Sequence, residues 1–348
     1  MTKTTSIALL AAALPLACAS PAYADHGAAG TGPATAGPLI GASARTLPHG
    51  KAALSLEATI AEPDNRSDAT LAALAGAHVH AHDQDSGQVY TLSAAYGLSD
   101  DITLSVSLPY IRRLAIREGE HAHSGGVVTN SVVARGNSAG IGDAAVLAKW
   151  RFTGENHHGW EAAAIAGLKL PTGATHEIDD EGERFETEHQ PGTGSWDPVL
   201  GLALTRPLPH GGFSASAVYQ LSTPGSQRTT LGDRAQAAIG LTHRLAGPAI
   251  EYHAHEHHDE PAEHHHEAPR VTLDGVIELN AEWEGREREA GVLDRASGGK
   301  ALFLSPGLRL NSGVWGLSLG GSIPLAQDIR LSHSDTAYRL RLGVSRGF

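Results

Sequence analysis

A short stretch of the chain concentrates the residue types that bind transition metals. Residues 251–267 hold seven histidines and six carboxylates in seventeen positions. Imidazole is the commonest side-chain metal ligand, it suits Zn, Cu and Ni, and histidine-rich tracts are typical of metal binding. The predicted ligands are His253, His255, His257, His258, His264, His265, His266, Glu256 and Asp259. We expect multivalent, weak chelation of Zn, Cu or Ni; the other interpretation is a hydrophilic insertion under weak constraint.

The residue types of the whole chain also limit the chemistry that it can perform. The sole cysteine, Cys18, lies near the amino terminus, so thiolate ligation and a soft Cu(I) site are not indicated. A helical zinc-hydrolase motif needs histidine four residues after His255, where Asp259 stands. His243 is the only histidine on the apolar face of an expected strand and has no evident serine partner for a lipase-type triad. We therefore expect no enzyme and no required cofactor.

Other histidines gather in three further polar connections. His78, His80 and His82 fall in the first, and His121 and His123 in the second. In an extended segment, His-x-His places both rings on one side, which makes a workable chelating pair. The third connection adds His176 and His189. Metal binding by these loops is a second, separate prediction.

Charged residues recur on the polar face of the alternating segments described next. They are Glu57, Asp143, Lys149, Arg151, Glu161, Lys169, Arg234, Arg244, Asp274, Glu278, Glu282, Arg309, Arg339 and Arg341. We predict that they line a lumen. There they would either tune selectivity or hold the wall together through ion pairs, and both interpretations stand.

The elements that position these residues are alternating segments. Residues 338–348 place Tyr338, Leu340, Leu342, Val344 and Phe348 on one face and polar residues on the other, which is the period of a β-strand. A tilted strand of about 9–11 residues crosses a bilayer. Twelve such segments occur, at 54–60, 90–98, 102–110, 143–152, 160–170, 200–204, 213–221, 235–241, 271–283, 302–310, 315–323 and 338–348. They predict an all-β fold, a transmembrane antiparallel β-barrel of the outer-membrane type; a soluble β-sandwich is the alternative.

The connections sort by length into two sets that alternate along the chain. The long ones are 62–87, 113–140, 174–195, 222–232, 287–300 and 326–336; the short ones are 99–101, 153–159, 207–212 and 311–313. Outer-membrane barrels have long external loops and short periplasmic turns. The exception is 247–270, which parity places on the periplasmic side although it is long.

The amino terminus reads as an export signal. Lys3, an apolar run and Ala22-Tyr23-Ala24 indicate a signal peptide over 1–24. Residues 25–49 predict a flexible leader, either periplasmic or inserted in the lumen, and 50–348 the barrel with its insertion at 251–267. A net charge of −12 argues against nucleic acid as a partner.

Several short segments resemble one known family. They are Thr-Leu-Pro-His-Gly at 46–50, Ile-Gly-Asp-Ala-Ala at the start of 141–152, Gly-Leu-Lys-Leu-Pro-Thr-Gly at 167–173 and Asp-Pro-Val-Leu-Gly at 197–201. Together they resemble the outer-membrane family associated with the meta-pathway of phenol degradation. The resemblance implies a barrel transporter for small, often hydrophobic compounds. The histidines depart from the family pattern.

The combined expectation is a passive outer-membrane channel for small solutes with a periplasmic metal-binding tract. Either the solute is the metal itself, or it is a small organic compound and metal binding is incidental. A non-conducting structural or adhesion barrel is the third possibility. The expected partners are outer-membrane lipid, the solute, and the barrel-assembly machinery through Tyr338 to Phe348.

Overall fold

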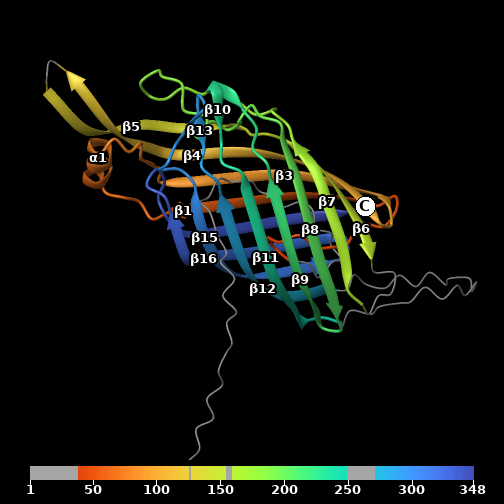
Figure 1. The fold of residues 1–348 in the computed structure, drawn as a ribbon. Helices are drawn as coiled ribbons and strands as arrows, with labels where there is room; N and C mark the ends of the chain where they lie inside the picture. Colours follow the sequence, from red (N-terminus) through yellow and green to blue (C-terminus); the bar gives the residue numbers. More distant parts are fainter. Residues whose placement is uncertain (1–37, 125–126, 154–158, 249–270) are drawn as a thin grey trace, which may run out of the picture.

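The computed structural model describes residues 38–124, 127–153, 159–248 and 271–348, whose strands close into a barrel (Figure 1). No helix among them is long and apolar enough to cross a membrane. The predicted signal peptide, residues 25–37 of the leader and the tract 251–267 lie outside the described residues.

Twelve strands form the ring. The sheet has fourteen strands in all, and two of them, β2 (His82–Asp83) and β5 (Val127–Ile141), lie outside the ring. The ring strands are β1 (Ala52–Pro63), β3 (Ser86–Ser99), β4 (Ile102–Ser124), β6 (Ala145–Thr153), β7 (Glu161–Lys169), β8 (Asp197–Leu208), β9 (Gly211–Gln220), β11 (Arg234–Ala246), β12 (Val271–Glu284), β15 (Gly299–Ser312), β16 (Trp315–Ile329) and β17 (Thr336–Gly347). Antiparallel pairing of β1 with β17 and of β4 with β6 closes it. The prediction of a twelve-stranded barrel is confirmed.

Each strand has one outward apolar face and one inward polar face. On β1, Leu56 is 50% exposed whereas its neighbour Glu57 is only 8% exposed. The same alternation puts Leu340 and Leu342 of β17 outside. A bilayer covers such an outward belt, and the polar face is left to line the lumen.

The two ends of the barrel differ as predicted. Consecutive strands meet through short turns at one end, for example between Leu208 and Gly211 and between Ser312 and Trp315. We call this the inner end, and the opposite end, which carries the long connections, the outer end. The histidine tract is flanked by β11, which ends at the inner end, and by β12, which begins there. This follows because His243 of β11 pairs with Gly211 at the β8–β9 turn, and β12 pairs with β11.

The outer connections contain structure that the alternation did not predict. The predicted connection 113–140 is largely a hairpin of β4 and β5 that extends beyond the ring (Figure 1). The connection 62–87 contains α1 (Asp68–Gly76), whose N-cap Ser67 accepts a hydrogen bond from the Thr70 amide. The other short elements are the 3₁₀ turn η1 (Ser226–Arg228) and the small sheet of β10 (Thr229–Thr230), β13 (Arg288–Glu289) and β14 (Val292–Leu293). Outside the bilayer both faces of a strand meet water, so no alternation marks it.

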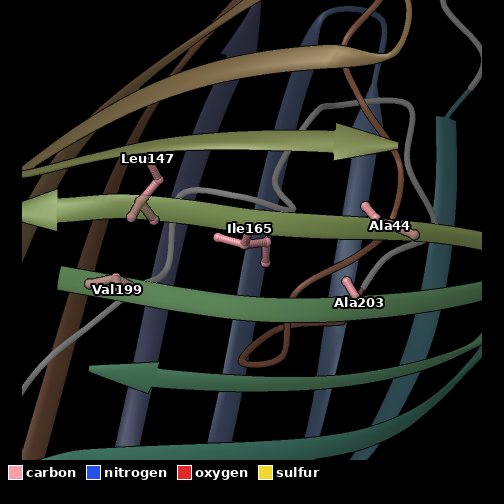
Figure 2. Packing of buried hydrophobic residues seen from close by; sticks show 6 residues of the cluster. Ala44, Leu147, Ile165, Val199 and Ala203 are labelled. Carbon is pink, nitrogen blue, oxygen red and sulfur yellow. The ribbon is translucent and has the colours of Figure 1, made fainter. Parts of the chain in front are cut away.

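Residues 38–49, which we call the lumen segment, lie inside the barrel. Ala44 is fully buried and packs with Leu147, Ile165, Val199 and Ala203 of the wall (Figure 2). The leader was predicted to be flexible and either periplasmic or in the lumen. Over residues 38–49 it is in the lumen and held by hydrogen bonds, because the wall supplies partners for its backbone.

The outward belt makes a stability prediction. Leu342→Arg places a charge near the middle of β17, on the lipid face, and should lower the free energy of unfolding by about 2–4 kcal/mol. Ile178→Arg is the control, since Ile178 is equally exposed but lies in an outer connection. Urea unfolding in lipid vesicles, followed by tryptophan fluorescence, measures the free energy of unfolding of both variants. Equal losses in the two variants would contradict a lipid-facing Leu342.

Candidate functional site in the barrel lumen

Glu278 on β12 holds the start of the lumen segment. Its carboxylate, 1% exposed, accepts hydrogen bonds from the amides of Leu39, Ile40 and Gly41, at 3.1 Å from Ile40 and 2.9 Å from Gly41. A segment that crosses a lumen has no neighbouring strand, so its amides need side-chain acceptors. Bonds to a charged acceptor are shorter and stronger than neutral ones.

Two cations of the wall bind the carbonyls of the same segment. Arg309 Nη2 donates to the oxygen of Pro38 at 2.8 Å, and Lys149 Nζ donates to the oxygen of Ser43 at 3.0 Å. Further contacts are Ala42 N to Ser216 Oγ at 3.0 Å, Ala44 N to Thr205 Oγ1 at 2.9 Å and Arg45 Nε to Glu161 Oε2 at 3.7 Å. Four predicted lumen residues, Lys149, Glu161, Glu278 and Arg309, thus surround the lumen segment.

Glycine allows the lumen segment to approach the wall. A Cβ on Gly307 of β15 would collide with the Cδ1 atom of Leu39, and one on Gly97 of β3 with the carbonyl oxygen of Pro48. The segment therefore runs from the middle of the wall at Leu39 to the inner rim at Pro48. It crosses the inner half of the lumen.

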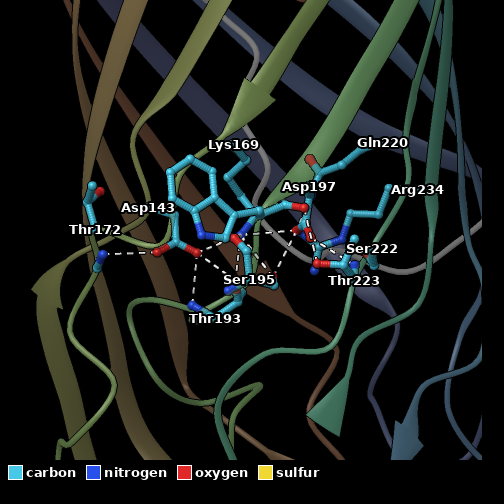
Figure 3. Close-up of polar contacts among 12 residues, drawn as sticks. Asp143, Lys169, Thr172, Thr193, Ser195, Asp197, Gln220, Ser222, Thr223 and Arg234 are labelled. Atoms are coloured by element: carbon cyan, nitrogen blue, oxygen red, sulfur yellow. Dashed lines mark hydrogen bonds and ion pairs between the residues drawn. The ribbon is translucent and has the colours of Figure 1, made fainter. Parts of the chain in front are cut away.

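An ion cluster lies nearer the outer end. Lys169 Nζ lies 2.7 Å from Asp143 Oδ2 and 3.0 Å from Asp197 Oδ2 (Figure 3). Asp143 also accepts hydrogen bonds from the amides of Gly173 and Thr193, both at 2.9 Å. Because these glycine and threonine residues belong to the connection between β7 and β8, the cluster draws that connection inward over the lumen.

A cavity of about 160 Å³ occupies the outer half of the lumen. Its lining includes Asp143, Lys169 and Arg234 of the wall and Glu287 and His333 of the outer connections. Burial and the neighbouring Glu188 raise the pKa of Glu287 to about 10, so this carboxyl is neutral at pH 7. The outer half of the lumen thus offers space lined by both polar and apolar groups.

One wall of the cavity carries a cluster of imidazoles around a carboxylate. His82, Glu188, His189 and His333 form it, and we call it the outer histidine cluster. Glu188 Oε1 lies 3.2 Å from His82 Nε2 and 3.9 Å from His189 Nε2, while Oε2 lies 3.3 Å from His333 Nε2. The ring of His82 meets those of His189 and His333 edge to face, with centroids 4.3 and 4.7 Å apart.

The charges in the outer histidine cluster follow from its burial. Burial lowers the pKa of His82 well below its usual value and that of His189 to about 4, so both rings are neutral at pH 7. Burial opposes ionisation of Glu188, but the facing His82 and His333 rings hold its pKa well below its usual range. Burial also opposes protonation of His333, but its contact with Glu188 raises its pKa. The cluster therefore combines neutral donors with an ionised carboxylate.

The other predicted lumen charges pair along the wall. Arg341 Nη1 bonds Glu57 Oε1 at 2.6 Å, and Arg339 binds both oxygens of Glu282, at 2.7 and 2.9 Å. The remaining pairs are Arg234 with Glu284 at 3.1 Å, Arg244 with Asp274, and Arg151 with Asp101 of the inner turn at 2.8 Å. These charges support the wall, which is the structural interpretation left open above.

The structure separates the histidines predicted to bind metal. His82 is in the cluster, and His80 lies near Glu118 and Glu186, 3.4 and 3.6 Å from their carboxylates. His121 and His123 share a contact of 3.1 Å between ring nitrogens at the β4–β5 hairpin, and the His78 ring lies 4.5 Å from that of His121. His176 is exposed in the third connection. The tract ligands, His253 to His266, lie outside the described residues.

Comparison with known proteins identifies the family. The family model described as "Putative MetA-pathway of phenol degradation" matches residues 49–260, which is more than half of the chain. The chain belongs to this family. The predicted resemblance is thereby confirmed, and no curated protein matches the chain.

Solved structures agree on the fold. The COG4313 outer membrane channel from Pseudomonas putida F1 is 16% identical, with a TM-score of 0.54 and coverage of 87% of this chain and 97% of that one. The β domain of the Bordetella autotransporter BrkA (9% identity, TM-score 0.40, 87% and 100% covered) and LpxR from Salmonella typhimurium (12%, 0.38, 84% and 99%) are less similar. The fold and the family place the chain in the bacterial outer membrane.

Sequence reasoning missed Glu188 and His333 and the role of residues 38–45. Glu188 precedes a histidine that was noticed, but nothing in its spacing pointed to His82, which is more than a hundred positions away. His333 stands alone between two serines, so no His-x-His signal marked it. Residues 38–45 are small and without periodicity. The only feature of the sequence that could have indicated a segment in the lumen was the pair Glu278 and Arg309, because charges in a narrow lumen need partners.

The anchoring of the lumen segment makes a labelling prediction. In a Cys18→Ser background, Ser43→Cys supplies a unique thiol at a position that is 1% exposed. Glu278→Ala removes charge-assisted bonds of about 1.5–3 kcal/mol each and should speed maleimide labelling at least about tenfold. Glu282→Ala is the control on the same strand, because Glu282 pairs with Arg339 and not with the segment. Equal rates in both variants would contradict the anchoring role.

Proposed function

We propose that the protein is an outer-membrane channel for the passive movement of small solutes, in which the lumen segment is the internal barrier. The observation that carries this proposal is the division of the lumen: a cavity lies in the outer half, and residues 38–49 cross the inner half. The barrier is held by hydrogen bonds and ion pairs, so it can be displaced without unfolding the barrel. No catalytic step is part of the proposal.

Two further points support a channel. One solved barrel with a similar fold is described as an outer membrane channel, and 97% of that chain is covered. In addition, the strands of the ring pair with one another all the way round, and the lumen segment is not a member of the sheet. A barrel whose wall is complete without its filling is suited to let that filling move.

The lining of the cavity bears on the solute. Arg234 and Lys169 have carboxylate partners, whereas Asp83 and Glu188 add negative charge at the outer connections. Such a lining favours small polar solutes and cations over anions. In this version of the proposal, the solute is a metal ion or a small cationic complex.

A second candidate solute is a small aromatic compound. Pro109, Ile111, Pro191 and Leu231 give the same cavity an apolar side, and the family is described by a pathway of phenol degradation. In this version, metal binding is incidental to transport. The two versions predict different selectivity for the same barrier.

In either version, we propose that the histidine tract acts at the inner mouth. Its flanking strands end at Ala246 and Val271, at the same end as the inner turn that Thr46 and His49 contact through Asp100. We propose that residues 251–267 bind Zn²⁺, Cu²⁺ or Ni²⁺ there, next to the point where the lumen segment leaves the wall. Metal held at this mouth would change the local charge and so alter passage.

The barrier makes a prediction for conduction. Glu278→Ala combined with Arg309→Ala removes the anchors of residues 38–41, so single-channel conductance in planar bilayers should rise several-fold over wild type. The Glu282→Ala control should match wild type. Liposome swelling with arabinose and with benzoate separates the polar from the aromatic solute. If every variant fails to conduct and to swell liposomes, the barrel is structural and the proposed function is wrong.

The tract makes a separate prediction. Adding Zn²⁺ or Cu²⁺ at micromolar concentration should change the conductance of wild type, and deletion of 253–266 should remove most of this response. Replacing the same residues by an equally long Gly/Ser sequence controls for the shortening of the connection. A metal response of full size in both altered chains would show that the tract has no part in it.

A further inference from the structure

The outer histidine cluster joins residues from three separate outer connections. His82 comes from β2, Glu188 and His189 from the connection between β7 and β8, and His333 from that between β16 and β17. We infer that His82, Glu188 and His189, with Glu186 as a fourth ligand, form a binding site for a divalent transition metal ion, Zn²⁺ or Ni²⁺ or Cu²⁺, in the wall of the outer cavity. This site is distinct from the tract at the inner mouth.

The donor atoms already lie at nearly chelating distances. One donor atom from each of His82, Glu186, Glu188 and His189 can be chosen so that all four lie within 4.8 Å of one another. Four ligands at zinc-bond lengths stand about 3.4 Å apart, so the widest pair needs to close by about 1.4 Å. Glu186 is the most exposed of the four ligands, so its side chain is the freest to rotate toward an ion.

The two oxygens of Glu188 divide their roles. Oε1 faces both His82 Nε2, at 3.2 Å, and His189 Nε2, at 3.9 Å, so it points toward the metal position. Oε2 faces His333 Nε2 at 3.3 Å. A second partner that orients a ligating carboxylate in this way is typical of metal sites. We therefore assign His333 as a positioning residue.

His82 supplies an independent reason to expect a ligand. The residue is 5% exposed, and neither of its ring nitrogens has a hydrogen-bond partner among the described residues. Its Nε2 is close to Glu188 but not in hydrogen-bonding geometry. A buried polar atom without a partner costs free energy, and such atoms are rare unless something binds them. A metal ion on Nε2 would remove this cost.

The backbone around the ligands is fixed from several sides. The amide of His82 donates to Ser332 at 3.1 Å, next to His333. Arg113 donates to the carbonyls of His189 and Gln190, at 3.3 and 3.2 Å. Ligands held in place before the metal arrives lose little conformational freedom on binding, which favours affinity. A metal here would also tie the three connections together.

The donor set indicates the class of ion. Two imidazoles with carboxylate oxygen suit Zn²⁺, Ni²⁺ and Cu²⁺, whereas Mg²⁺ and Ca²⁺ prefer oxygen ligands alone. Because His82, Glu188 and His189 line the cavity, an ion arriving from outside reaches them before it meets the lumen segment. The inference rests on the proposed function and deepens it by naming a class of solute or effector at the outer mouth. The site itself is tested by metal binding, independently of conduction.

A zinc titration of the metal-free, full-length barrel in detergent tests the site, with a chromophoric chelator as competitor. The wild-type barrel should bind one equivalent of Zn²⁺ tightly. The double variant His82→Gln/His189→Gln should bind that equivalent at least tenfold more weakly. His176→Gln/His210→Gln is the matched control, since both histidines are exposed and outside the cluster, and should keep that equivalent. His333→Gln should weaken the same equivalent about tenfold without abolishing it.

Two checks keep the outcome clear. The comparison is repeated in the chain lacking 253–266, so that the tract cannot hide the loss, and heat-modifiable migration on gels shows that each variant is folded. If the double variant is folded and still binds one equivalent of Zn²⁺ tightly, the inferred site is wrong. Loss of the equivalent with unchanged conductance supports the site and leaves the channel intact. Tight binding in a barrel that does not conduct supports the site and refutes the channel.

Discussion

Most polar residues of the ring face a narrow lumen, because the alternate positions face lipid. Glu57 and Leu56 show the constraint at its simplest: one side chain is buried inside and the next is half exposed outside. A charge that cannot reach bulk water needs a partner nearby. The inside of this barrel is therefore organised by the pairing of charges, and apolar packing such as that of Ala44 is secondary.

The charges find three kinds of partner, and the kind decides what each part of the lumen can do. Arg339 with Glu282 and Arg341 with Glu57 pair within the wall and leave it complete. Lys169 with Asp143 binds an outer connection and sets the shape of the cavity. Glu278 binds the lumen segment, which is not part of the wall. Only the contacts of the lumen segment, with Glu278, Arg309 and Lys149, would be exchanged if the segment moved, so the proposed barrier depends on them.

The local pattern predicts whatever the bilayer enforces and little else. The twelve strands, the ends to which the connections belong and the polar face with Glu278 and Arg309 all follow from a period of two. The β4–β5 hairpin and α1 lie beyond the bilayer, where that constraint ends, so alternation does not reveal them. The lumen segment is equally hidden: its backbone makes the contacts, and a stretch from Pro38 to Arg45 has no side-chain pattern to read.

The histidines show the same limit and its consequence for chemistry. A run of histidines such as 264–266 is obvious in the sequence, because its members are adjacent along the chain. His82 and His189 meet because β2 and the β7–β8 connection fold over one mouth, and their burial removes the competing water. A ligand set gains affinity from such fixed neighbours more than from the number of histidines. The outer histidine cluster, where the geometry is set, therefore suits the selective metal site that we infer, and multivalent chelation stays a prediction for the tract.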